Sequence, residues 1–187
     1  MASKFRLLAA CAFLLATIAL ALPVYAQNIQ GTVVSTGDGD TLRAKVGNET
    51  ITIRLACIDA AETGQHPWGQ QSANRLKQLL PVGQSVNLRT IEKDKYGRTV
   101  AEIFKGDQSV NLQMVQEGQA VVYPQYVNKC PQLKQQLLQA EANAKKQHLA
   151  FWKQEKPVMP WDFRHISQKP NQTPQQHQGN CDPSYPD

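Results

Sequence analysis

The chain has 187 residues, of which 41% are hydrophobic, and a formal net charge of +5 at pH 7. This length suits one domain plus a tail, and mild basicity is compatible with a polyanionic substrate without establishing one. The spacing of the cysteines matches no common zinc site, which excludes a structural zinc fold.

Residues 1–26 have the pattern of a cleavable export signal. Lys4 and Arg6 precede an apolar run, and residues 24–26 supply the small-residue pattern of a signal peptidase site. We therefore expect cleavage after Ala26, a secreted or periplasmic protein, and no permanent membrane anchor. The alternative is a retained anchor, but the apolar run is near the lower length limit for a membrane span.

Three cysteines remain after this cleavage, and an oxidising compartment permits one disulfide among them. Cys57 continues the alternation of a strand, so we expect it to be a small buried hydrophobe. Cys130 and Cys181 both occur in loop-like contexts. The sequence therefore favours a bond between Cys130 and Cys181.

Strands dominate the first half of the expected domain. Residues 29–58 alternate apolar and polar side chains, with turn signals at 37–39 and at 47–48. Two further strands are predicted over 86–91 and 98–104, joined by a turn at 94–97. Short turns between early strands favour a small closed antiparallel barrel, in the mainly β or α+β class.

Helices are predicted between and after these strands. Pro67 and Pro81 bracket the first one, Ser109 is suited to cap a short second one, and a third starts near Pro131 and ends near 151–152. The predicted domain covers 27–156. From 157 to 187 the composition turns to Pro, Gln, Asn and Ser, which predicts a tail that buries no core.

Carboxylates flank the predicted strands. Asp40 has the parity of the apolar residues Leu42 and Ala44, so it points toward the core, where a carboxylate needs a partner such as a metal ion. Asp59 ends an apolar strand. Oxygen ligands from these two aspartates suit Ca²⁺ or Mg²⁺. The alternative for the aspartates is a turn in which they bond backbone amides.

Three further charged residues complete a set suited to phosphodiester chemistry. Glu62 follows the aspartates closely enough to reach water at such a metal site, as a general base requires. Arg54 and Arg98 present planar forks that match phosphate oxygens. Each arginine has an alternative interpretation, as a solvent-facing strand residue for Arg54 and as a hairpin-turn charge for Arg98.

The three stretches 38–41, 54–62 and 94–98, in this order and spacing, resemble the staphylococcal nuclease (thermonuclease) family. The sequence from Ala140 to Trp152 is similar to the family's last helix. The resemblance covers roughly residues 29–153. It implies an OB-fold, a five-stranded β-barrel with about three packed helices, and Ca²⁺-dependent hydrolysis of DNA and RNA that leaves 3′-phosphate ends.

The resemblance also implies a role for each matching position. Asp40, Asp59 and the backbone carbonyl of Ala60 would be metal ligands, with Asp38 outside the first shell. Glu62 would be the base, drawing a proton from water, and Arg54 and Arg98 would hold the phosphate. The implied substrate contacts are Tyr123, Tyr126 and Lys95.

Two departures from the family pattern affect the loop around Glu62. Ala60-Ala61 stand where the family usually has Thr-Pro, which leaves a carbonyl ligand in place but removes a stiff residue. The loop over 63–68 is shorter than in the best-known members. We therefore expect a long substrate-contacting loop to be missing.

Two other function classes remain open at this stage. One is a non-catalytic OB-fold module that binds nucleic acid, although such modules usually lose carboxylates or arginines that this chain keeps. The other is a protein-binding module displayed by the tail. We expect a monomer.

Overall fold

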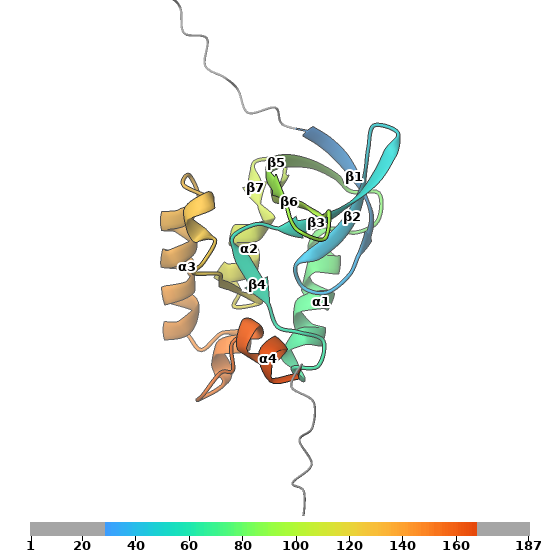
Figure 1. Cartoon of the computed structure of the whole chain (residues 1–187). Coiled ribbons are helices and arrows are strands. Elements are labelled where there is room, and N and C mark those ends of the chain that lie inside the picture. Colours follow the sequence, from blue (N-terminus) through green and yellow to red (C-terminus); the bar gives the residue numbers. More distant parts are fainter. Residues whose placement is uncertain (1–28, 168–187) are drawn as a thin grey trace, which may run out of the picture.

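The computed structural model describes residues 29–167, so the expected leader lies outside the described residues. Strands form a closed barrel with helices packed outside it (Figure 1). The barrel strands are β1 (Ile29–Thr36), β2 (Thr41–Val46), β3 (Glu49–Leu55), β5 (Ser85–Lys93) and β6 (Thr99–Lys105). This architecture confirms the predicted five-stranded barrel of the OB type.

The barrel closes through a pairing that the sequence did not predict. Neighbouring strands are antiparallel in the order β3-β2-β1-β5-β6. The first and last strands of this order, β3 and β6, then pair in parallel, with Arg54 opposite Val100. The barrel is therefore mixed rather than wholly antiparallel.

Alternating side chains fill the barrel. Leu42 and Ala44 on β2 and Ile53 on β3 are fully buried, whereas Arg43 and Lys45 between them are exposed. This two-residue period is what a strand with one face on a core requires. It also confirms the inward parity predicted for Asp40, which is only 5% exposed.

Three helices pack around the barrel over the stretches that the sequence predicted, except that the third ends at Lys146 and not near residues 151–152, which belong to a separate 3₁₀ turn. They are α1 (Trp68–Leu79), α2 (Val110–Gln116) and α3 (Lys134–Lys146). The hydroxyl of Ser109 accepts a hydrogen bond from the Leu112 amide, which confirms the predicted cap of α2. The shorter elements are β4 (Ile58–Ala60), β7 (Gln108–Ser109), β8 (Ala120–Val122) and the 3₁₀ turns η1 (Val127–Lys129) and η2 (Ala150–Lys153).

A buried asparagine joins α2 to the barrel beside the turn that leads into β4. The Asn111 Oδ1 accepts a hydrogen bond from the Ile103 amide, and its Nδ2 donates to the Ala56 carbonyl, each at 2.9 Å. Asn111 is 0% exposed. Since unpaired buried backbone groups are costly, these bonds fix where the chain leaves β3.

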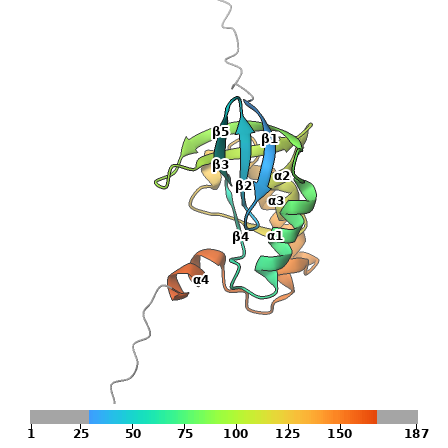
Figure 2. The same cartoon turned by 90° about the vertical axis from the view of Figure 1, so that its right-hand side faces the viewer.

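The first part of the expected tail is folded. Residues Pro160–Ser167 form helix α4, which lies beyond one end of the barrel next to β4 (Figures 1 and 2). Trp161 and Met159 pack against a small cluster that contains Phe151 and Trp152. Trp161 and Met159, together with the buried Pro160, supply the apolar contacts of this stretch.

The predicted disulfide partner of Cys130 was wrong. Cys130 is bonded to Cys57 with a Cα–Cα distance of 6.4 Å. The alternation that suggested a buried strand position for Cys57 ends at Leu55, and Cys57 itself has φ +66°, in a turn. That turn brings its side chain to the end of η1. Cys181 lies outside the described residues.

Among the described residues, no helix has the length and apolar composition needed to cross a membrane.

Candidate active site

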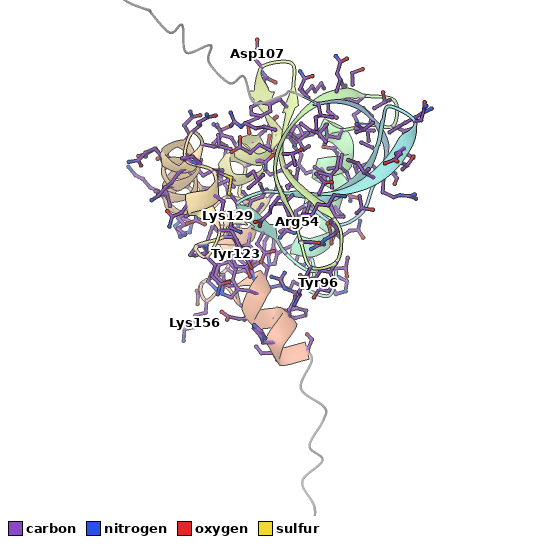
Figure 3. The ribbon with its side chains drawn as sticks, turned by 45° about the horizontal axis from the view of Figure 1, so that its top comes forward. Arg54, Tyr96, Asp107, Tyr123, Lys129 and Lys156 are labelled. Atoms are coloured by element: carbon purple, nitrogen blue, oxygen red, sulfur yellow. A yellow bond between two sulfur atoms is a disulfide. The ribbon has the colours of Figure 1, made fainter. Side chains whose placement is uncertain are left out.

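The candidate site lies where β2 begins and β3 leads into β4. The Asp40 carbonyl accepts a hydrogen bond from the Leu55 amide at 2.8 Å, which ties the start of β2 to the end of β3. β4 then leaves the barrel and pairs with β8, with Asp59 opposite Val121. Two stretches separated by about twenty residues in sequence are thereby placed against each other (Figure 3).

The Asp40 carboxylate accepts a backbone hydrogen bond and also forms an ion pair with an arginine. Its Oδ2 accepts a hydrogen bond from the Ala60 amide at 2.7 Å and lies 3.0 Å from Nη1 of Arg54. The N–H and C=O groups of one strand residue point to the same side. The carbonyl of Ala60 therefore lies on the Asp40 side of β4, as its implied role as a ligand requires.

Asp59 is fully buried and is surrounded by arginine. Its Oδ1 accepts from Nη2 of Arg54 at 2.7 Å, and Arg164 on α4 donates to both carboxylate oxygens, at 3.1 and 2.7 Å. The side chain is 0% exposed. A buried carboxylate needs such positive partners, because an unpaired charge in this position would be strongly destabilising.

Arg54 connects the two aspartates instead of facing solvent. Its guanidinium contacts Asp40 and Asp59 and also donates to the carbonyls of Leu55 and Ile58, each at 3.0 Å. Its side chain is 13% exposed, which rejects the interpretation as an ordinary surface arginine. The remaining exposed edge is what could contact a phosphate.

Burial and crowding shift the ionisation of Asp40. Burial raises the pKa of Asp40 to about 7, and the negative charges of Asp38 and Asp59 act in the same direction. The Arg54 guanidinium and the Ala60 amide lower the pKa but do not outweigh burial. The charged and neutral forms of Asp40 are therefore close in free energy near neutral pH.

Two glycines allow the backbone to pack tightly around these carboxylates. A Cβ on Gly39, between Asp38 and Asp40, would lie 2.7 Å from the Ala60 Cβ. A Cβ on Gly69 would lie 2.0 Å from the Glu62 carbonyl oxygen. Both distances are far below ordinary contact, so only glycine fits at these points.

Glu62 lies on the loop after β4, beside the aspartates. Its backbone amide donates to Oε1 of Gln65 at 2.9 Å, and its carbonyl accepts from the Gln65 amide at 2.8 Å. Its carboxylate pairs with Arg164 at 2.5 Å and is 31% exposed. The Glu62 side chain is therefore linked to Asp59 by a shared partner, Arg164, and remains accessible to water.

Sequence reasoning missed Arg164 and Gln65. Arg164 lies in the stretch that was expected to bury no core, and it joins Asp59 to Glu62. Gln65 is 8% exposed and donates to the Val158 carbonyl at 2.8 Å. The aromatic residues at 161 and 163, interrupting a Pro- and Gln-rich segment, were a signal that this segment packs on something.

The other predicted site residues lie around this cluster but do not join its ion pairs. Arg98 pairs with Asp94 at 2.7 Å in the turn between β5 and β6. Lys95 lies 5.0 Å from the ring of Tyr96 in the same turn. Asp38 accepts a long hydrogen bond, 3.4 Å, from the Asp40 amide.

The predicted substrate tyrosines form an aromatic group near α4. Tyr123 contacts Tyr126 edge to face, with ring centroids 4.8 Å apart. The other contact of Tyr123 is a stack with Trp161 of α4, at 5.3 Å and an interplanar angle of 9°. In Figure 3, Arg54, Tyr96 and Tyr123 lie toward the end of the molecule that carries α4, whereas Asp107 lies at the opposite end.

The donor set fits a hard divalent cation. Asp40 and Asp59 come close enough to share one guanidinium, and the Ala60 carbonyl lies on the same side. All of these donors are oxygen, which Ca²⁺ and Mg²⁺ prefer. A bound cation would add positive charge beside these two buried carboxylates.

The family model described as Staphylococcal nuclease homologue matches residues 52–154. The chain belongs to the staphylococcal nuclease family. Its match includes Arg54, Asp59, Glu62 and Arg98, whereas Asp40 precedes the matched range and Arg164 follows it.

Curated relatives of this family member carry nuclease names. It is 38% identical to an uncharacterized endonuclease of Escherichia coli over 76% of this chain and 90% of that protein. It is 34% identical to a protein named micrococcal nuclease from Shigella flexneri, over 79% of this chain and 87% of that protein. An uncharacterized endonuclease of Haemophilus influenzae is 38% identical over 71% of each chain. These relatives support a nucleic-acid hydrolase.

Proposed function

We propose that this protein is an exported, Ca²⁺-dependent nuclease of low sequence specificity that cleaves DNA and RNA and leaves 3′-phosphate ends. The observation that carries the proposal is the convergence of Asp40, Asp59, Arg54 and Glu62 at one end of the barrel. Nucleic acid is the substrate class that the family's names support. We expect the protein to act as a monomer.

Each side chain of the cluster has a role that its position allows. Glu62 is partly exposed and can accept a proton from an attacking water. Arg54, and Arg98 from the turn between β5 and β6, can donate to the phosphoryl oxygens as negative charge develops there. Bound Ca²⁺ would add Lewis-acid stabilisation of that charge. Asp40 and Asp59, with the Ala60 carbonyl, would hold the ion.

Weak sequence preference follows from the kinds of contact available. Arginine and lysine contact phosphates, which are the same at every nucleotide, and tyrosine stacks on any base. Binding should therefore weaken as salt increases, because phosphate contacts release counterions.

Export is supported by the leader pattern and by the disulfide. A bond between Cys57 and Cys130 is typical of proteins that fold outside the reducing cytosol. N-terminal sequencing of the protein recovered outside the cytosol tests the proposed cleavage after Ala26.

Cleavage assays with Glu62→Gln test the catalytic proposal. Purified protein is incubated with single-stranded DNA and with RNA, with Ca²⁺ or with chelator. We expect Ca²⁺-dependent cleavage with 3′-phosphate products, lowered by about 10²–10⁴-fold in Glu62→Gln, the usual contribution of a general base. Glu49→Gln, at an exposed glutamate on β3, is the matched control.

The rival function has a different outcome in the same experiment. Salt-sensitive binding of nucleic acid without cleavage in any divalent ion would identify a non-catalytic barrel. In that case the carboxylate cluster would have a structural role only.

A further inference from the structure

Helix α4 covers the candidate active site with contacts to both of its halves. Arg164 pairs with Asp59 and Glu62 in the carboxylate half. Trp161, one helical turn earlier, stacks on Tyr123 in the aromatic half. Helix α4 therefore contacts a residue proposed to bind the ion, Asp59, and a residue proposed to contact the nucleotide, Tyr123.

The contacts of Arg164 leave little of Asp59 for another cation. Arg164 donates to both Asp59 oxygens, and Oδ1 also accepts from Arg54. The third contact of Arg164 is the carboxylate of the proposed base, Glu62. Arg54 bonds Oδ1 of Asp59, whereas Arg164 also bonds Oδ2, so a divalent ion at Oδ2 would face the Arg164 guanidinium at hydrogen-bond distance, and like charges so close repel strongly.

The ionisation of Arg164 agrees with its position as a counter-charge. Burial acts to lower the pKa of the Arg164 guanidinium, but hydrogen bonds and charge from Asp59 and Glu62 raise it above its ordinary value. Since an arginine side chain does not lose its proton in proteins, Arg164 can vacate the site only by moving.

The packing of α4 permits such movement. Within Pro160–Ser167 only Pro160 is buried. Ile166 is 61% exposed, and Val158 just before the helix is 43% exposed. Besides the Arg164 ion pairs, the segment is attached through Met159 and Trp161 on the Phe151–Trp152 cluster, Trp161 on Tyr123, Phe163 beside Gly64 and the Gln65–Val158 hydrogen bond. Elements with so few buried contacts open at low free-energy cost.

We propose that residues 157–167 form an autoinhibitory strap, in which Arg164 occupies Asp59, one of the proposed ligands of the divalent ion, together with Glu62, and Trp161 covers Tyr123. Ion binding and strap docking are then mutually exclusive, and each weakens the other by the same factor. Because Arg164 lies beyond the family match at 52–154, the strap is a feature of this chain outside the matched nuclease core. The inference rests on the ion site of the proposed function.

Calorimetric titration with Ca²⁺ tests the strap without relying on activity. Purified Arg164→Gln should bind Ca²⁺ about tenfold or more tightly than the unchanged protein, within the usual range of coupling between competing ligands. Lys156→Gln, at an exposed lysine beside the strap (Figure 3), should bind as the unchanged protein does. An unchanged or weaker affinity in Arg164→Gln, with native circular dichroism, overturns the proposal.

Hydrogen exchange on the unchanged protein provides a second test that needs no variant. Saturating Ca²⁺ should speed amide exchange in residues 160–167 while α2 and α3 keep their protection. Unchanged exchange in α4 at saturation would contradict exclusion between ion and strap.

Cleavage assays, read together with the Ca²⁺ affinities, distinguish a failure of the strap proposal from a failure of the proposed nuclease function. Tighter Ca²⁺ binding in Arg164→Gln without cleavage by either protein would support the strap and reject the nuclease. Cleavage with unchanged Ca²⁺ affinity would support the nuclease and reject the strap. A loss of cleavage confined to Arg164→Gln, at equal affinity, would make Arg164 a catalytic residue and also reject the strap.

Discussion

Removing the Cys57–Cys130 disulfide should destabilise the protein by a magnitude that follows from its position. The bond joins residues 73 apart in sequence. In the chain-entropy treatment, closing a loop of this length lowers the entropy of the unfolded chain enough to stabilise the fold by about 4 kcal/mol. This is a large part of the roughly 5–15 kcal/mol by which single domains are stable.

The variant that isolates this effect is Cys57→Ala/Cys130→Ala. Both cysteines are buried, so alanine removes the bond without introducing a polar group. Alanine and cysteine both carry a Cβ, so the cost of the positive φ at residue 57 is similar before and after the change. The difference in stability therefore reports mainly on the cross-link.

Equilibrium unfolding in urea measures the effect. With a denaturant dependence of roughly 2 kcal/mol per molar urea, typical for small proteins, the midpoint should fall by about 2 M. Adding reductant to the unchanged protein should give the same shift, and Cys181→Ser should give none. A loss below about 1 kcal/mol, or an equal loss in Cys181→Ser, would refute the reasoning from loop length.

Two further predictions concern the site. Burial raises the pKa of Asp40 to about 7, so below that pH a proton competes with the ion for this carboxylate. The Ca²⁺ affinity should therefore fall by about tenfold per pH unit below pH 7 and become constant above it. Calorimetric titration with Ca²⁺ across this pH range measures whether affinity falls as pH drops. An affinity independent of pH would contradict the prediction. Gly69→Ala places a Cβ against the Glu62 carbonyl, so cleavage should fall by at least about tenfold as the loop shifts. Gly37→Ala, whose Cβ meets only ordinary contacts, is the control in the same assay, and equal rates in the two variants would argue against a strictly positioned loop.

Local pattern was sufficient to predict the barrel strands and their turns. A strand with one face on the core must alternate, and β2 does so throughout while β3 does so from Ile53 to Leu55. The same parity placed Asp40 inward before any contact was known. The cap of α2 was also predictable, because a serine side chain reaches the amide three residues later through local geometry alone.

Long-range pairing was not predictable from such patterns. The parallel contact between β3 and β6 closes the barrel. The local sequence pattern of either strand is the same as that of a strand left unpaired at a sheet edge, so it does not predict this contact. The cysteine bond shows the same limit. Cys57 followed an alternating pattern, yet the turn after Leu55 redirects it toward η1.

The sequence by itself determined the residue types of the site, the order in which they occur and the side of the strand on which Asp40 lies. The tertiary structure alone decided which charges meet: Arg54 bridges two aspartates, and Arg164, more than one hundred residues from Asp59, completes the cluster. The physical reason is that periodicity reports how a segment divides between core and solvent, whereas an ion pair depends on where separate segments pack. The segment 157–167 mixes apolar and polar residues without a regular period, and only its packing beside β4 placed an arginine on the candidate active site.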